Sequence, residues 1–157
     1  MPAADRPDIL IFPPLATLIA IVAAVALEWL VPLRLLPPAF TFWSTAIGVI
    51  LTVAAIALTI IGARTFAKAG TNVDPRKPAL RIVETGPYKF TRNPMYLGIV
   101  GLQFGLALLF SLDWALLGGV ALGAVLHYGV VLREEAYLTA KFGATYTEFQ
   151  TRSRRWF

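Results

Sequence analysis

The chain has 157 residues, of which 57% are hydrophobic and only 15% are charged, and its mean hydropathy is +0.68. A soluble domain carries about 25% charged and about 45–50% apolar residues, so this composition excludes a water-soluble globule and a disordered chain. Uncharged runs of 29, 20 and 19 residues separate Arg34 from Arg64, Arg92 from Asp113, and Asp113 from Arg133. Runs of this length can cross a bilayer core. The sequence therefore predicts an integral membrane protein, and its size indicates one domain, residues 1–157.

We predict an all-α fold with about four transmembrane helices, at residues 15–31, 42–61, 94–112 and 114–132. The last two spans are separated only by a corner at Ser111 to Trp114, so they should form a tight antiparallel hairpin. Glycine pairs inside them, Gly101-x-x-x-Gly105 and Gly119-x-x-x-Gly123, favour close helix packing.

A cleaved signal peptide is the competing interpretation of the first span, because Ala24-Val25-Ala26 resembles a cleavage site. The segment before the span contains Asp5, Arg6 and Asp8, however, and lacks the net positive charge usual in signal peptides. This favours a membrane span that stays in the protein.

The basic residues are distributed very unequally between the loops. Thirteen of the 14 Lys and Arg residues fall on one side of the predicted spans, and Arg34 alone falls on the other. The positive-inside rule then places both termini, the loop 62–93 and the tail 133–157 in the cytoplasm. The net charge of +5 is distributed so as to favour anionic lipid headgroups rather than nucleic acid as a partner.

The predicted cytoplasmic loop is rich in residues that end helices. Between residues 70 and 94 it contains four prolines and the turn residues Gly70 and Gly86, which prevent one continuous helix and favour a sharply turned, ordered loop. Ordered loops of this length are often functional. The alternative is a solvated basic loop that touches lipid headgroups.

The end of the fourth span carries ionisable residues at membrane depth. Helical spacing places His127 and Glu134 on one face, near the cytoplasmic mouth of the bundle. Such groups are costly in a membrane and tend to be functional. The alternative is that Glu134 and Glu135 are interfacial charges, with Arg133 as a snorkelling anchor.

The tail predicts a C-terminal amphipathic helix. Gly143 is a plausible helix stop, after which Tyr146 and Phe149 form a short apolar stripe. The last six residues, RSRRWF, combine basic and aromatic side chains in a pattern typical of an interfacial anchor. The chain has no cysteine, which excludes disulfides and thiolate metal sites, and its single histidine argues against a metal site built from histidines.

Two sequence blocks carry a resemblance to a known family. The segment GPYKFTRNPMYLG, residues 86–98, resembles the GxYxxxRHPxYxG signature of the isoprenylcysteine carboxyl methyltransferase family, much of which is shared by the related phospholipid N-methyltransferases. The segment EEAYLTAKFGATY, residues 134–146, is similar to that family's second block, EExxLxxxFGxxY. The blocks occur in the family's order, on either side of a two-helix hairpin, and the resemblance covers residues 80–157.

The resemblance implies a methyltransferase that binds S-adenosyl-L-methionine at the cytoplasmic face without a Rossmann domain. Glu134 matches the acidic residue that holds the cofactor, and its charge suits the cofactor's ammonium group. The full set of implied cofactor-binding residues is Ile82, Val83, Tyr88, Asn93, Pro94, Met95, Tyr96 and Glu134.

The expected reaction is methylation of a lipophilic or small membrane-partitioning acceptor that carries a carboxylate, an amine or a thiol. Methyl transfer from a sulfonium is an in-line displacement, so alignment of donor and acceptor provides most of the catalysis. We assign catalytic roles to three residues. Arg92 can orient an anionic acceptor, and Tyr96 or Glu135 can accept a proton.

The chain departs from the family pattern at two positions. Asn93 stands where the signature has His, and Val130 stands where the prenylcysteine enzymes have an Arg for the substrate carboxylate. The resemblance therefore does not specify a prenylcysteine substrate. A membrane scaffold or lipid-binding protein with the same fold is the non-enzymatic alternative. It would not need the intact set of Tyr88, Arg92, Tyr96 and Glu134.

Overall fold

The computed structural model describes residues 5–157, and this part of the chain is helical with no β-strand. The α-helices are α1 (Pro13–Leu30), α2 (Phe42–Lys68), α3 (Pro94–Phe110), α4 (Asp113–Leu126), α5 (Leu132–Phe142) and α6 (Ala144–Arg152). A 3₁₀ turn, η1 (Gly86–Lys89), precedes α3, and a π turn, η2 (His127–Val131), joins α4 to α5.

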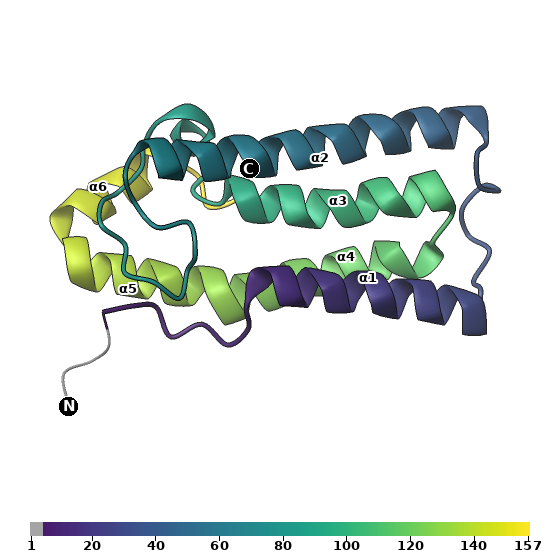
Figure 1. Ribbon diagram of the computed structural model, residues 1–157, viewed down its shortest axis with the longest axis horizontal. Coiled ribbons are helices and arrows are strands. Elements are labelled where there is room, and N and C mark those ends of the chain that lie inside the picture. Colours follow the sequence, from purple (N-terminus) through teal and green to yellow (C-terminus); the bar gives the residue numbers. More distant parts are fainter. Residues whose placement is uncertain (1–4) are drawn as a thin grey trace.

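Helices α1 to α4 lie side by side along the long axis of the molecule (Figure 1). Helix α2 packs on α3, α1 packs on α4, and α3 also packs on α4. Loops 31–41 and 111–112 lie at one end of this bundle. The loop 69–93, α5 and α6 lie at the other.

Three helices are long and apolar enough to cross a membrane: α1, α2 and the continuous helix Asp113–Phe142, which comprises α4, η2 and α5. Helix α3 is apolar but has only 17 residues, a length of about 26 Å against a hydrocarbon core of about 30 Å. A membrane crossing by α3, and hence the count of four spans, stays a prediction.

Two helices extend beyond the predicted membrane spans at the charged end of the bundle. The second span is predicted to end at residue 61, and its helix α2 continues to Lys68 and stops just before Gly70, whose φ is +70°. The fourth span is predicted to end at residue 132, and its helix continues through the π turn to Phe142. The bounds of the spans themselves stay predictions. Lys, Arg and Glu are good helix formers, so the onset of charge does not end a helix.

The hairpin is confirmed, because Ser111, with a φ of +52°, turns the chain between α3 and α4. The predicted close packing holds for one glycine of each pair. A Cβ atom on Gly105 would lie 2.8 Å from the backbone nitrogen of Thr52, and one on Gly119 would lie 3.0 Å from the Phe104 ring, whereas Gly101 and Gly123 have only ordinary contacts, at 3.5 and 3.9 Å.

Helices α2 and α3 also approach closely at two other glycines. A Cβ atom on Gly98 would lie 2.6 Å from the carbonyl oxygen of Ala55, and one on Gly48 would lie 2.7 Å from the backbone nitrogen of Leu109.

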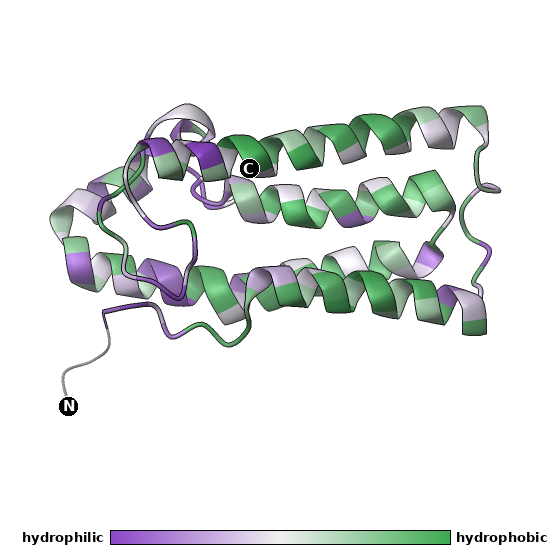
Figure 2. Cartoon of the chain, viewed as in Figure 1, coloured by the Kyte–Doolittle hydropathy of each residue, from purple (hydrophilic) through white to green (hydrophobic). Residues whose placement is uncertain are grey.

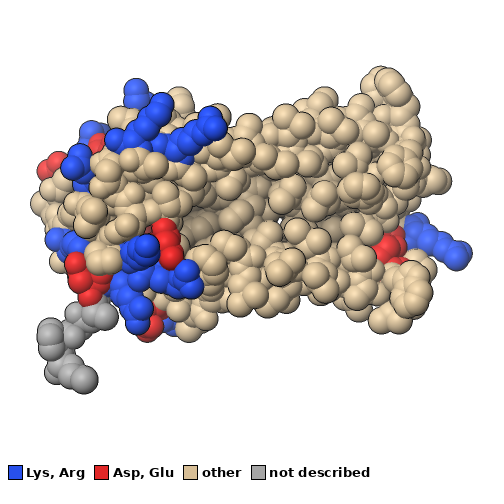
Figure 3. Space-filling model, viewed as in Figure 1, with Lys and Arg blue, Asp and Glu red and all other residues tan. Residues whose placement is uncertain are grey.

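The helical surfaces are largely apolar, and polar residues concentrate toward the ends of the molecule (Figure 2). Basic side chains gather at the end that carries α5 and α6 (Figure 3). This agrees with the charge separation in the sequence. The orientation of that end toward the cytoplasm stays a prediction.

Candidate functional site

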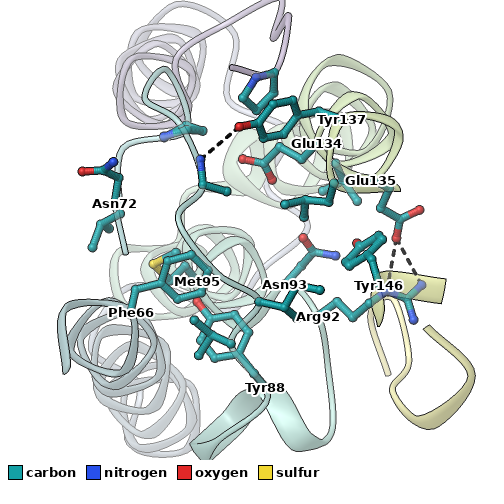
Figure 4. A pocket seen from close by; sticks show the side chains of 18 of the residues that line it. Phe66, Asn72, Tyr88, Arg92, Asn93, Met95, Glu134, Glu135, Tyr137 and Tyr146 are labelled. Atoms are coloured by element: carbon teal, nitrogen blue, oxygen red, sulfur yellow. Dashed lines mark hydrogen bonds and ion pairs between the residues drawn. The ribbon is translucent and has the colours of Figure 1, made fainter. Parts of the chain in front are cut away.

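A cavity lies at the charged end of the bundle, between the loop 69–93, the start of α3 and helix α5 (Figure 4). Together with its open mouth it encloses about 840 Å³ of empty space. Its lining comprises Pro7, Phe66, Asn72, Val73, Asp74, Pro75, Lys77, Ala79, Arg81, Ile82, Val83, Tyr88, Arg92, Asn93, Met95, Tyr96, Val131, Glu134, Glu135, Tyr137, Leu138, Tyr146 and Phe149.

The loop that covers the cavity is ordered by its own hydrogen bonds. The Asn72 side chain donates to the carbonyl of Pro78 at 2.8 Å, and the Leu80 backbone donates to the Thr71 hydroxyl at 3.0 Å. The second bond encloses the first in sequence, so together they close the segment 71–80 into one turned loop beside the cavity. The interpretation as a sharply turned, ordered loop is therefore confirmed.

An acidic residue on this loop is neutralised locally. Asp74 forms two hydrogen bonds with the Arg76 guanidinium, at 3.0 and 2.8 Å, and also accepts the Arg76 backbone N–H. These bonds lower the pKa of the Asp74 carboxyl to about 2. Asp74 therefore lines the cavity as an ion already paired with a cation.

The first sequence block directs a tyrosine into the cavity. Gly86, with a φ of +60°, and Pro87 begin the 3₁₀ turn η1, and Tyr88 within it is only 3% exposed. Its ring packs on Phe66 of α2, with 4.8 Å between centroids. Its hydroxyl has no hydrogen-bond partner within residues 5–157. Burial raises the pKa of Tyr88, so the hydroxyl remains neutral and can donate to a ligand.

The second block contributes a carboxylate without a cationic partner. Glu134 accepts a hydrogen bond from the Tyr96 hydroxyl at 2.8 Å, and no ion pair to Glu134 is found in the part of the chain described. In Figure 4 Glu134 and Tyr88 lie on opposite sides of the cavity. A lone carboxylate at a partly apolar site favours a positively charged ligand.

The neighbouring residue, Glu135, is in the opposite situation. It accepts hydrogen bonds from Arg92, at 3.1 and 3.3 Å, and from Arg155, at 2.8 to 3.1 Å. The second terminal nitrogen of Arg92 donates to the carbonyls of Gln150 and Ser153. Four of the five N–H groups of this guanidinium are thus engaged by the protein. The Glu135 and Arg92 side chains are each 10% exposed.

The C-terminal residues complete this side of the site. Backbone bonds join Arg92 to Arg154 at 2.8 Å and Arg154 to Phe90 at 3.1 Å, and the Asn93 side chain donates to the carbonyl of Arg155 at 3.0 Å. Three of the last six residues, Ser153, Arg154 and Arg155, thus bind the first sequence block, and Arg155 also binds Glu135 of the second. The tail therefore has a structural role that the sequence analysis did not predict, and the interfacial anchor stays a prediction.

His127 does not share the site with Glu134. It lies outside the cavity lining, and its Nδ1 atom accepts a hydrogen bond from the Trp156 indole at 3.1 Å. The π turn His127–Val131 explains the difference, because it winds more residues per turn than the α-helical spacing assumes. The prediction of a common face is wrong for His127, whereas Val131 and Leu138 do line the cavity with Glu134.

The structure brings nearly all predicted site residues together. Arg92, Tyr96 and Glu135 line the cavity, as do all the predicted cofactor-binding residues except Pro94. Pro94 is the first residue of α3 and is buried there, where the absent N–H of proline has no cost. Val130 is fully buried in the helix core and outside the lining, so that position does not offer a contact in the cavity.

Several lining residues were missed from the sequence. Tyr137 lies one helical turn after Glu134, and Tyr146 is part of the second block, so helical spacing and the motif could have indicated both. Phe66 was missed because it lies beyond the predicted end of the second span. No pattern in the sequence indicates Pro7, since it reaches the cavity only through the tertiary fold.

The family model for phospholipid methyltransferases matches residues 43–145 of the chain. The match extends from α2 through both sequence blocks and so includes most of the cavity lining. No curated protein and no solved structure matches the chain significantly.

Proposed function

Because the chain belongs to the phospholipid methyltransferase family, we propose that it is a membrane-embedded methyltransferase that uses S-adenosyl-L-methionine. The acceptor is a lipophilic or small membrane-partitioning molecule with a carboxylate, an amine or a thiol. The cofactor enters from the cytoplasm, and the acceptor enters from the bilayer. The observation that carries the proposal is the unpaired carboxylate of Glu134 in a cavity built from both sequence blocks.

The lining suits a ligand that is cationic at one end and aromatic at the other. Glu134 keeps one carboxylate oxygen free of the bond to Tyr96, and this oxygen can accept from an ammonium group. Across the cavity, Phe66, Ile82 and Met95 offer an apolar wall for an adenine ring, beside the unpartnered hydroxyl of Tyr88. Burial without a partner is costly for such a hydroxyl, so a ligand that bonds to it is favoured.

When bound, the cofactor supplies a methyl group on a sulfonium sulfur, which keeps the electron pair of the broken C–S bond while the acceptor heteroatom forms the new bond. The chain's part is to align acceptor and donor. We propose that Arg92 offers its remaining N–H to an anionic acceptor, while its pairing with Glu135 fixes the direction of the guanidinium.

For an amine or thiol acceptor, a proton must also leave. Both oxygens of Glu135 already accept hydrogen bonds from arginine N–H groups, so they are not free to receive a proton from the acceptor. The Tyr96 oxygen still has an acceptor position beside the hydrogen bond that it donates to Glu134, so it can take the acceptor's proton while it passes its own proton to the Glu134 carboxylate. Of the two proton acceptors predicted from the sequence, we therefore favour Tyr96.

The proposal is tested by titrating the purified protein in detergent with S-adenosyl-L-methionine and measuring the heat of binding. Saturable binding with a stoichiometry of one per chain is expected. Incubation of the protein and lipid extracts with methyl-labelled cofactor then identifies the acceptor class. Absence of cofactor binding by folded protein would reject the proposal and leave the scaffold or lipid-binding alternative.

A further inference from the structure

The segment before α1 forms part of the cavity mouth, although it lies outside the residues that match the family model. We call residues 5–12 the N-terminal strap. The strap follows α5 in Figure 1 before it enters α1. Within it Pro7 is buried and lines the cavity. A ligand in the cavity would therefore lie against the strap.

Two hydrogen bonds join backbone atoms of the strap to the long helix. The Leu10 backbone nitrogen of the strap donates to the carbonyl of Gly129 in the π turn at 2.9 Å. Arg133 donates to the carbonyl of Asp8 at 2.9 Å. Both contacts use backbone atoms of the strap, so they fix its path along the helix rather than the position of one side chain.

Tyr137 joins the strap to the loop across the cavity mouth. Its hydroxyl donates to the Asp5 carboxylate at 2.8 Å and accepts from the Ala79 backbone and from Lys141, each at 3.1 Å. A phenol has one donor and two acceptor positions, so its capacity is filled. Lys141 also pairs with Asp5 at 2.6 Å. The side chain of Tyr137 thus binds both the strap and the loop, which lie on two sides of the cavity mouth.

The two sides of the cavity differ in how firmly they are closed. On the C-terminal side, Glu135 and Arg92 are 10% exposed, and breaking a buried pair is strongly destabilising. On the strap side, Asp5 is 61% exposed and Lys141 is 26% exposed. Exposed ion pairs are weak because water and salt screen them. The strap side is therefore the side that opens more easily, at residues 5–8, because Ile9 and Ile11 farther along the strap pack on the core of the bundle.

We propose that the N-terminal strap is the gate through which the cofactor enters and leaves, and that Tyr137 is the positioning residue that holds the gate closed. The inference rests on the proposed function, since it takes S-adenosyl-L-methionine as the ligand. A docked strap covers the bound cofactor through Pro7, and release of the strap from Tyr137 precedes dissociation.

The test compares cofactor dissociation rates of the wild type, Tyr137→Phe and Tyr128→Phe, measured by displacement of labelled S-adenosyl-L-methionine. Tyr137→Phe should dissociate about 3- to 10-fold faster, as expected for the loss of hydrogen bonds on an exposed rim. Tyr128→Phe is the matched control, because Tyr128 is 67% exposed and lies outside the cavity. Asp5→Asn weakens the same contact by changing its partner on the strap, so it should also speed dissociation. It provides a second test if Tyr137→Phe does not fold.

A second measurement reports on the strap directly. The chain has no cysteine, so Pro7→Cys introduces a single thiol at the cavity wall. Saturating S-adenosyl-L-methionine should slow alkylation of this thiol by a maleimide, and adding Tyr137→Phe should speed alkylation of the free protein. Unchanged dissociation rates together with an unprotected thiol would overturn the gate. A wild type that binds no cofactor would instead overturn the proposed function.

Discussion

Replacing Glu134 by Gln tests the cofactor site with little disturbance of its geometry. Glutamine has nearly the same shape, and its side-chain oxygen can still accept the hydrogen bond from the Tyr96 hydroxyl. No arginine or lysine within residues 5–157 forms an ion pair with Glu134, so the substitution leaves no cation unpaired. What the variant loses is the negative charge that we propose binds the cofactor's ammonium group.

A hydrogen bond to a charged group contributes about 1.5–3 kcal/mol. Glu134→Gln should therefore raise the dissociation constant for S-adenosyl-L-methionine by about 10- to 150-fold. Its melting temperature without cofactor should stay close to that of the wild type. Calorimetry provides the dissociation constant, and thermal unfolding in the same detergent provides the melting temperature.

Glu135→Gln is the matched control, since it removes the same charge from the adjacent residue. Glu135 binds Arg92 and Arg155, so its loss leaves two guanidinium groups without their carboxylate. This variant should lower the melting temperature clearly and affect cofactor affinity less than Glu134→Gln does. Negligible losses of cofactor affinity in both variants would refute the assignment of Glu134 to the cofactor. They would favour the alternative that the two residues are interfacial charges.

Three further predictions follow from other parts of the structure. Arg92→Lys should bind cofactor nearly normally but methylate poorly, because lysine cannot reproduce the geometry of a paired guanidinium; near-wild-type methylation would refute a role of Arg92 in orienting the acceptor and leave it as a structural partner of Glu135. Gly98→Ala should cost about 1–3 kcal/mol of stability by overpacking against α2, whereas Gly101→Ala, whose Cβ meets only Ala55 at 3.5 Å, should melt like the wild type. Reporters fused to the C-terminus should be active on the cytoplasmic side only, and external activity would reject the predicted topology.

Local patterns in the sequence were sufficient to predict the helices of the bundle and to identify the two sequence blocks. Apolar runs identify the bundle, and the prolines and glycines around η1 indicate the turned loop. Because Tyr88, Tyr96 and Glu134 lie within short motifs, their convergence could be predicted from the resemblance, and the structure brings them to one cavity.

The remaining parts of the site depend on contacts that leave no local pattern. Lys141 binds Asp5, which lies 136 residues earlier in the chain, and Arg133 binds Asp8, which lies 125 residues earlier. Nothing in the residues around Gly129 indicates a π turn, because its side chains are compatible with an ordinary α-helix. The sequence likewise does not show that Glu135 forms ion pairs with Arg92 and Arg155 whereas Glu134 forms none within residues 5–157, because these partners come from distant segments of the chain.

The unequal lengths of α2 and α3 give a physical reason for the position of the cavity. Gly62 of α2 lies against Met95, the second residue of α3, where an added Cβ would come within 2.7 Å of the Met95 side chain. Residues 63–68 of α2 therefore extend about 9 Å beyond the start of α3. Phe66 lies on this extension and forms one wall of the cavity, and Met95 at the start of α3 also lines it.

The short α3 also affects how an acceptor can reach the site. With a length of about 26 Å, it cannot span a hydrocarbon core of about 30 Å unless the bilayer thins locally around it. Its first residues should then lie at the level of the lipid headgroups or slightly below them, and Arg92 and Asn93 immediately precede it. A lipid-borne acceptor would not have to leave the membrane to meet them. The polar cofactor, in contrast, can approach from the water-exposed strap. This difference in depth supports entry of the two substrates from different phases.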